Sequence, residues 1–342
     1  MGNEEWGVGN EPKETTSGHS TFHIPHSPLT LVVMGTGPFA VPMFRALYDT
    51  RHTIAALVTK PPHGRAGQVE GSPNPMRAVA DEHGTKVFDP ESVNTDETRS
   101  YLATLEPDLF VVADYGQILK PETLAVARLG GVNLHGSLLP KYRGAAPIVW
   151  AIYHGDTETG VSVIHMTPRV DAGPVLAQAR TPIDPEENAV SLEHRLAELG
   201  AALICEVIDR LAIGEVQPLP QDASLASPAR RLRKTDSVVD WQRSAQQIRN
   251  QIRALEPWPR TSTQWHRAHG EPMRLILCHA VADATSAEAA PGTIVEVTKH
   301  HVAVATGEGR LLVDRLQAPG KRAMSIADFM NGHTIAMGER FT

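Results

Sequence analysis

Short apolar runs alternate with helical stretches through the first two hundred residues, and this alternation constrains the fold more than any other feature of the chain. The predicted strands are residues 31–34, 54–58, 109–112, 132–134 and 161–165. The predicted helices between them are residues 38–48, 75–82, 95–105, 121–127 and 146–153. Such alternation predicts an α/β domain built on a doubly wound, mostly parallel sheet. A long amphipathic stretch at residues 191–211, followed by Gly214, closes this half of the chain.

Beyond a proline-containing passage at residues 218–231 the pattern changes to short strands. One helix is predicted at residues 245–255, because Glu256-Pro257 ends it. Strands are predicted at residues 261–265, 273–277, 292–298, 301–305 and 310–316, which indicates a small β-barrel of the oligonucleotide-binding (OB) type. We therefore expect four segments: a disordered N-terminal extension (1–29), a catalytic domain (30–214), a linker (215–233) and a C-terminal β-barrel domain (234–342).

Composition and charge restrict the partners. The chain is 41% hydrophobic and 21% charged, as in soluble globular proteins, and no apolar run approaches the roughly 20 residues of a membrane helix. Cys205 and Cys278 lie far apart in apolar settings, which favours packed thiols in a reducing cytoplasm. The net charge of −7 disfavours a general nucleic-acid coat protein, but residues 230–274 hold ten basic and four acidic residues. This stretch is either a local polyanion-binding face or a solvated helix face beside a linker.

Two polar side chains, Asn133 and His135, lie two residues apart at the end of the predicted strand 132–134. Residues two apart in a strand point to the same side, so Asn133 and His135 can converge on one ligand atom. They lie at the carboxyl end of a strand, where open α/β sheets bind ligands. An amide N–H and an imidazole there can polarise a carbonyl, although packing of the loop is the plainer explanation.

A third candidate is Asp171, in the loop Asp171-Ala-Gly173 after the predicted strand 161–165. If the two strands are adjacent and parallel, this loop faces His135, and Asp171 can orient the imidazole or accept a proton. An acid before a glycine also fits a simple Asx turn.

Other chemistries have weaker signals. The loop Gly35-Thr-Gly37-Pro-Phe-Ala40 matches the dinucleotide pattern, but the second strand leads to Thr59-Lys60 without the ribose-binding acid. A tight turn that lines another ligand fits better. His19, His23 and His26 suggest a metal by spacing alone, and we expect no metal. No nucleophile elbow is present. The chemistry predicted is metal-free group transfer onto a substrate's own nucleophile.

The stretch Asn133-Leu-His135-Gly-Ser137-Leu-Leu-Pro140, with Arg143-Gly144 and Asp171-Ala-Gly173, resembles the signature of 10-formyltetrahydrofolate-dependent formyltransferases. The resemblance runs from about Leu31 to the C-terminus and is strongest to members of the family that act on initiator methionyl-tRNA.

The resemblance implies that Asn133, His135 and Asp171 are catalytic, with 10-formyltetrahydrofolate as formyl donor and initiator methionyl-tRNA as acceptor. The folate-binding residues that it implies are Ser137, Leu138, Leu139 and Pro140, together with Tyr115, Gly116, Gln117 and Ile118. The tRNA-binding residues that we expect are Arg65, Arg231, Arg233 and Lys234. Relatives carry lysines in the loop that corresponds to residues 64–70, where this chain keeps only Arg65. We expect a cytoplasmic monomer without membrane attachment.

Two other functions stay open at this stage. A formyltransferase for an amino group of a nucleotide-linked sugar shares the same motifs, and a non-catalytic nucleic-acid-binding module would use only the barrel. The segment Gly320-Lys-Arg, with Asp328-Phe329 further on, and the basic stretch favour tRNA. The Asn133, His135 and Asp171 set argues against a non-catalytic module.

Overall fold

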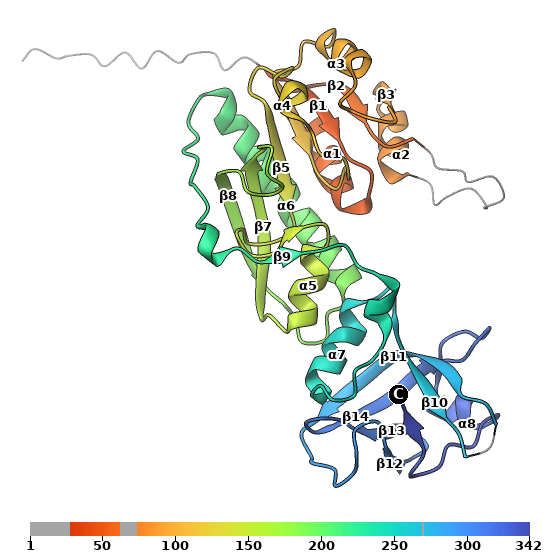
Figure 1. Ribbon diagram of the computed structural model, residues 1–342. Coiled ribbons are helices and arrows are strands. Elements are labelled where there is room, and N and C mark those ends of the chain that lie inside the picture. Colours follow the sequence, from red (N-terminus) through yellow and green to blue (C-terminus); the bar gives the residue numbers. More distant parts are fainter. Residues whose placement is uncertain (1–27, 62–73, 269) are drawn as a thin grey trace, which may run out of the picture.

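The computed structural model describes residues 28–61, 74–268 and 270–342. The predicted extension (1–29), apart from its last two residues, and Arg65 lie outside the described residues. Figure 1 shows two domains in an elongated arrangement, with α5 (Pro147–His154) and α7 (Ala245–Ala254) packed against each other between the large sheet and the barrel.

The first domain contains the predicted sheet. Its strands, in spatial order, are β3 (Val87–Phe88), β2 (Thr53–Val58), β1 (Thr30–Met34), β4 (Leu109–Val112), β5 (Gly131–His135), β7 (Glu158–His165) and β8 (Val175–Pro182). The pairs from β3 to β5 are parallel, which confirms the mostly parallel sheet. In contrast, β7 runs antiparallel to β5, and β8 antiparallel to β7. The assumption of parallel neighbours behind the Asp171 prediction is therefore wrong, because the chain re-enters the sheet at the carboxyl end of β5.

Helices cover both faces of this sheet, so the domain is doubly wound. One face packs against α1 (Val41–Tyr48), α2 (Pro75–Glu82), α5 and α6 (Ala189–Ala212), and the other against α3 (Asp96–Ala103) and α4 (Pro121–Leu124). Alternate residues of β1 show this division: Leu31 and Val33 belong to the first core, and Val32 and Met34 to the second. Strands buried on both faces are continuous apolar runs, which is why they were predicted from the sequence.

A buried histidine fixes the start of β1. The backbone N–H of Leu29 donates to Nδ1 of His52 at 3.0 Å, and Nε2 lies 3.3 Å from Oδ1 of Asp209 on α6. The His52 side chain is completely buried, and burial lowers its pKa below the ordinary value of 6.5. His52 is therefore held neutral in the folded protein at neutral pH.

The second domain is the predicted small barrel. Its antiparallel strands follow the order β12 (Ile294–Val297), β13 (Val302–Ala305), β14 (Arg310–Gln317), β11 (Met273–Asp283), β10 (Thr261–His266) and β16 (Arg340–Phe341), while β15 (Met324–Ser325) pairs with β14. Hydrogen bonds from Ile294 N to Glu339 O and from Phe341 N to Gly292 O nearly close the barrel between β12 and β16. Its core contains Trp265 and, from α8 (Ile326–Met330), Phe329.

The predicted linker follows the surface of the first domain. Leu219 and Val175 exchange two backbone hydrogen bonds of 2.8 Å. After η2 (Ala223–Leu225), β9 (Pro228–Ala229) pairs in parallel with β6 (Arg143–Gly144). After the linker come η3 (Lys234–Ser237) and then α7. It is thus an ordered part of the first domain's surface.

Arginines of the basic stretch hold the two domains together. Arg243 donates to the hydroxyl of Tyr153 on α5 at 2.7 Å and lies 4.7 Å from its ring centroid. Arg249 donates to Pro185 O, and Arg253 to Glu187 O, in the segment before α6. Part of the positive charge between residues 230 and 274 therefore serves the domain interface.

Candidate functional site

The three predicted catalytic residues meet at the carboxyl end of β5. Asn133 and His135 leave the strand on one side, as their spacing predicted, and Asp171 lies beside both. The amide Nδ2 of Asn133 donates to Oδ1 of Asp171 at 3.5 Å, and Nδ1 of His135 lies 3.6 Å from Oδ2 of the same carboxylate. The carboxylate thus spans the amide and the imidazole.

The other nitrogen of the imidazole already has a hydrogen-bond partner. Nε2 of His135 lies 2.9 Å from the carbonyl oxygen of Tyr142. A carbonyl only accepts, so Nε2 carries the hydrogen and Nδ1 is the atom that faces Asp171. The ring is only 6% exposed, which restricts it to this orientation.

Asp171 reaches the site from an unexpected direction. It lies in the connection between the antiparallel strands β7 and β8, in the left-handed conformation with φ of +50°. Its Oδ2 also accepts the backbone N–H of Gly144 at 2.9 Å. The loop therefore curves back from the edge of the sheet to the end of β5, and the convergence that we predicted arises without parallel strands.

The segment after His135 is tightly fixed. The peptide bond Leu139-Pro140 is cis. Ser162 of β7 donates to Ser137 O at 2.6 Å and accepts from Leu139 N at 3.0 Å, while Gln178 of β8 donates to Leu139 O at 2.9 Å. Ser137 itself is completely buried, so its side chain serves this turn through a bond to the carbonyl of Lys141.

The predicted folate-binding residues form two groups. Leu138, Leu139 and Pro140 line a cavity of about 530 Å³ together with the 155–159 turn and β8. Asn133, His135 and Asp171 do not line this cavity.

The second group follows β4, the strand beside β5, where Val112 pairs with Asn133. Tyr115 is buried, and burial raises the pKa of its hydroxyl. Gln117 accepts from Val93 N at 2.9 Å through its side chain, and the side chain of Ile118 is 62% exposed. Within the described chain, the N–H groups of Gly116, Gln117 and Ile118 make no hydrogen bond. Within the described residues this loop therefore offers unbonded N–H donors and an apolar side chain, at the end of the strand beside β5.

Two family models match the chain. The model described as "Formyl transferase" matches residues 29–208, and "Formyl transferase, C-terminal domain" matches residues 231–334. The chain belongs to the formyltransferase family. It is 42% identical over 323 residues to a methionyl-tRNA formyltransferase of Rhodopirellula baltica, covering 91% of this chain and 96% of that protein. It is 40% identical over 310 residues to one of Trichlorobacter lovleyi, covering 90% and 95%.

Solved structures agree with the formyltransferase fold. An N-formyltransferase from Helicobacter canadensis, solved with folinic acid and dTDP-3-aminofucose, superposes with a TM-score of 0.60 at 16% identity. The alignment covers 85% of this chain and all of that one. At this identity the likeness concerns the fold, which includes the mostly parallel sheet and the barrel.

The predicted tRNA contacts lie where the linker meets the barrel domain. Arg231, Arg233 and Lys234 are exposed. Arg230, in contrast, is paired with Asp236 at 2.6 Å and lies over the ring of Trp150. The first three are therefore free to meet a polyanion at this junction.

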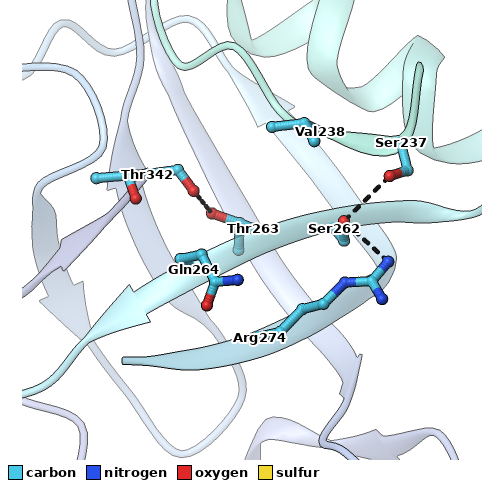
Figure 2. Close-up of a pocket in the computed structure, with 7 residues that line it drawn as sticks. All are labelled: Ser237, Val238, Ser262, Thr263, Gln264, Arg274 and Thr342. Atoms are coloured by element: carbon cyan, nitrogen blue, oxygen red, sulfur yellow. Dashed lines mark hydrogen bonds between the residues drawn. The ribbon is translucent and has the colours of Figure 1, made fainter. Parts of the chain in front are cut away.

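A smaller cavity of about 200 Å³ lies in the barrel domain (Figure 2). Hydroxyl groups line it, and Arg274 donates to Ser262 at 3.4 Å, which in turn lies 3.3 Å from the hydroxyl of Ser237. None of its lining residues was a predicted site residue.

Among residues 28–61, 74–268 and 270–342, no three or more His, Cys, Asp or Glu side chains are grouped as a metal site. In the same ranges, no helix has both the length and the apolar character that crossing a membrane requires.

Sequence reasoning missed three residues that support the trio: Tyr142, Gln221 and Ser227. Tyr142 accepts from His135 and has a left-handed φ of +62°. Gln221 and Ser227 belong to the linker; Gln221 binds the backbone of Asp171, and Ser227 binds that of Tyr142. Tyr142 directly precedes the Arg143-Gly144 pair of the family signature, whereas the linker carries no such motif.

Proposed function

We propose that this protein transfers the formyl group of 10-formyltetrahydrofolate to the free α-amino group of methionyl-initiator tRNA, for translation initiation. The observation that carries the proposal is the similarity of about 40% over both domains to methionyl-tRNA formyltransferases. The convergence of Asn133, His135 and Asp171 supports it, because that arrangement suits attack of an amine on a carbonyl. The enzyme would act in the cytoplasm as a monomer.

Asn133 is proposed to stabilise the charge on the formyl oxygen. An asparagine amide has two N–H donors, and one of them is directed to Asp171. The second is available for the oxygen on which negative charge develops during attack. Where measured, removing such a donor costs roughly 100- to 1,000-fold in rate.

His135 and Asp171 are proposed to handle the proton of the amine. With Nε2 bound to Tyr142, only Nδ1 of His135 can exchange a proton with the reacting groups. Neutral Nδ1 accepts the amine proton as the amine nitrogen bonds to the formyl carbon, and protonated Nδ1 donates a hydrogen bond to the formyl oxygen. The bond from the formyl carbon to the folate nitrogen then breaks, and the proton passes to that nitrogen, so that tetrahydrofolate leaves. The carboxylate of Asp171, 3.6 Å away, stabilises the imidazolium that forms.

The loop after β4 fits a folate. Its free N–H groups at Gly116, Gln117 and Ile118 match the acceptors of a flat heteroaromatic ring, and Ile118 supplies apolar surface. The folate, when bound there, supplies the carbonyl carbon that the amine attacks. Leu138, Leu139 and Pro140, on the cis turn after His135, are proposed to complete the folate site.

The tRNA is proposed to bind the barrel side, with Arg231, Arg233 and Lys234 against its phosphates. Arg65 is proposed as a further contact. The alternative acceptor is a nucleotide-linked amino sugar. Such a sugar is present in the Helicobacter canadensis structure, whose sequence is only 16% identical to this chain.

The test supplies 10-formyltetrahydrofolate with either methionyl-initiator tRNA or an amino-sugar nucleotide. We expect formylated methionyl-tRNA and no formylated sugar. In the variant His135→Ala the rate should fall roughly 100- to 10,000-fold while folate still binds. The matched control is His300→Ala, at an exposed histidine of the barrel domain, which should keep the wild-type rate. Formylation of the sugar alone, or equal rates in both variants, would contradict the proposal.

A further inference from the structure

The segment between the two matched family regions contacts both loops of the proposed catalytic trio. Residues 209–230 lie outside the regions that the two family models match. Two of their side chains, Gln221 and Ser227, bind the backbone of the first domain at the site itself. A connection that only joined two domains would not need such contacts.

Both the nitrogen and the oxygen of the Gln221 side-chain amide form hydrogen bonds, the nitrogen to the Asp171 loop and the oxygen to Arg143 of β6. Its Nε2 donates to the carbonyl oxygens of Asp171 at 2.9 Å and Gly173 at 2.7 Å. Its Oε1 accepts from Nε and Nη2 of Arg143 at 3.0 and 2.7 Å. The two bonds from Nε2 hold the backbone around Asp171, which has a left-handed conformation, and the two bonds to Oε1 tie this loop to the side chain of Arg143.

The contacts of Gln221 link the backbone of Asp171 to the strand that binds the carboxylate of the same residue. Arg143 directly precedes Gly144, whose N–H donates to Oδ2 of Asp171. One amide therefore holds both the backbone of Asp171 and the strand that binds its side chain. If Gln221 is lost, the carboxylate can shift relative to Asn133 and His135.

We propose that Gln221 is a positioning residue for formyl transfer, which holds Asp171 against Asn133 and His135. The proposal rests on the proposed function, because it assumes that Asp171 takes part in the reaction. Only an amide supplies donors for two carbonyls and an acceptor for a guanidinium at the same time. Gln221 thus acts through Asp171 and contacts neither substrate.

The first test is Gln221→Met, which keeps the length of the side chain and removes every hydrogen bond. A displacement of about 1 Å at a catalytic group costs up to about 100-fold, so we expect kcat to fall about 10- to 100-fold. The KM values for both substrates should change little, because the residue lies on neither proposed binding surface. The matched control is Gln217→Met in the same linker, at an exposed glutamine whose side chain makes no hydrogen bond within the described residues, and it should keep the wild-type kcat.

A second variant separates positioning from folding. Gln221→Glu keeps the oxygen that accepts from Arg143 but has no N–H for the carbonyls of Asp171 and Gly173. It should unfold at nearly the wild-type temperature and still lose kcat. If Gln221→Met proves unstable, this variant alone tests the proposal.

The deciding measurement is a double-mutant cycle with Asp171→Asn. Because Gln221 acts through Asp171, Gln221→Met should lower kcat little further in the Asp171→Asn background. The same fold loss in both backgrounds, or wild-type kcat for both Gln221 variants, would overturn the proposal. A wild-type kcat for Asp171→Asn alone would instead overturn the proposed role of Asp171, so the two failures are distinguishable.

Discussion

Gly144 pairs with the linker strand β9 and donates to the carboxylate of Asp171, which we propose to be catalytic, so replacing it with alanine perturbs both contacts. Its φ of +126° is a conformation that favours glycine. An added Cβ would lie 2.5 Å from the carbonyl oxygen of Ala229 on β9. The backbone N–H of Gly144 donates to Oδ2 of Asp171, so any shift of β6 also moves a donor away from the carboxylate.

The structure sets the size of the effect. An ordinary contact of this kind is 3.4 Å or more, so β6 and β9 must separate by about 0.9 Å. The separation weakens the hydrogen bond from Arg143 N to Ser227 O, which is 2.8 Å long. A misplacement of this size can cost about 100-fold in rate. The left-handed backbone adds a stability cost of about 1–3 kcal/mol. We therefore expect Gly144→Ala to lose about 100-fold in kcat and to be destabilised.

The assay compares formyl transfer and urea unfolding in Gly144→Ala and Gly214→Ala. Gly214 also has a positive φ, +75°, but an added Cβ there meets no atom within 4 Å. The control should therefore lose stability through its backbone conformation and keep the wild-type kcat. If both variants keep kcat, or both lose it equally, the argument from the contact between β6 and β9 is refuted.

Two further predictions concern charge. Replacing Arg231, Arg233 and Lys234 with alanine should weaken tRNA binding. The slope of the logarithm of the binding constant against the logarithm of the salt concentration should become shallower by about one for each cation that contacts a phosphate. Filter binding at several salt concentrations measures this slope. An unchanged slope would place the phosphate contacts elsewhere. Burial lowers the pKa of His52 below the ordinary histidine value of 6.5. The contribution of neutral His52 to the stability of the folded protein is therefore present above pH 6.5 and is lost as the pH falls below 6.5. The free energy of unfolding of His52→Leu should therefore decrease less than that of the wild type between pH 7.5 and pH 5.5, and equal decreases would contradict the assignment.

In the first domain the sequence predicted the strands that are buried on both faces and missed β3 and β8, which lie at the edges of the sheet. β1 and β4 are continuous apolar runs because helices cover both sides of the sheet. After two buried residues, β8 alternates half-buried and exposed ones and includes Gln178 and Arg180, so no apolar run marks it. The direction of β7 was also out of reach, because a strand has the same side-chain period in both directions.

The trio was predictable for a different reason from the residues that hold it. Asn133 and His135 are neighbours in sequence, and strand geometry alone brings them to one side. Gln221 is 50 residues from Asp171 and 78 from Arg143 along the chain. A glutamine next to Pro220 has no local pattern that distinguishes it from a loop residue, since its partners are backbone carbonyls that the sequence does not mark.

The position of Asp171 explains why the linker has to take part in the site. Asp171 lies in the connection to β8, which is the last strand of the sheet, so no further strand supports that connection. Unpaired carbonyls at an edge need a partner from elsewhere in the chain. The linker supplies it: Leu219 pairs with Val175 at the start of β8, and Gln221 binds the carbonyls of Asp171 and Gly173. The Asp171 carboxylate, which we propose to be catalytic, therefore depends on the segment that covers this edge of the sheet, and in this protein that segment leads directly to the barrel domain.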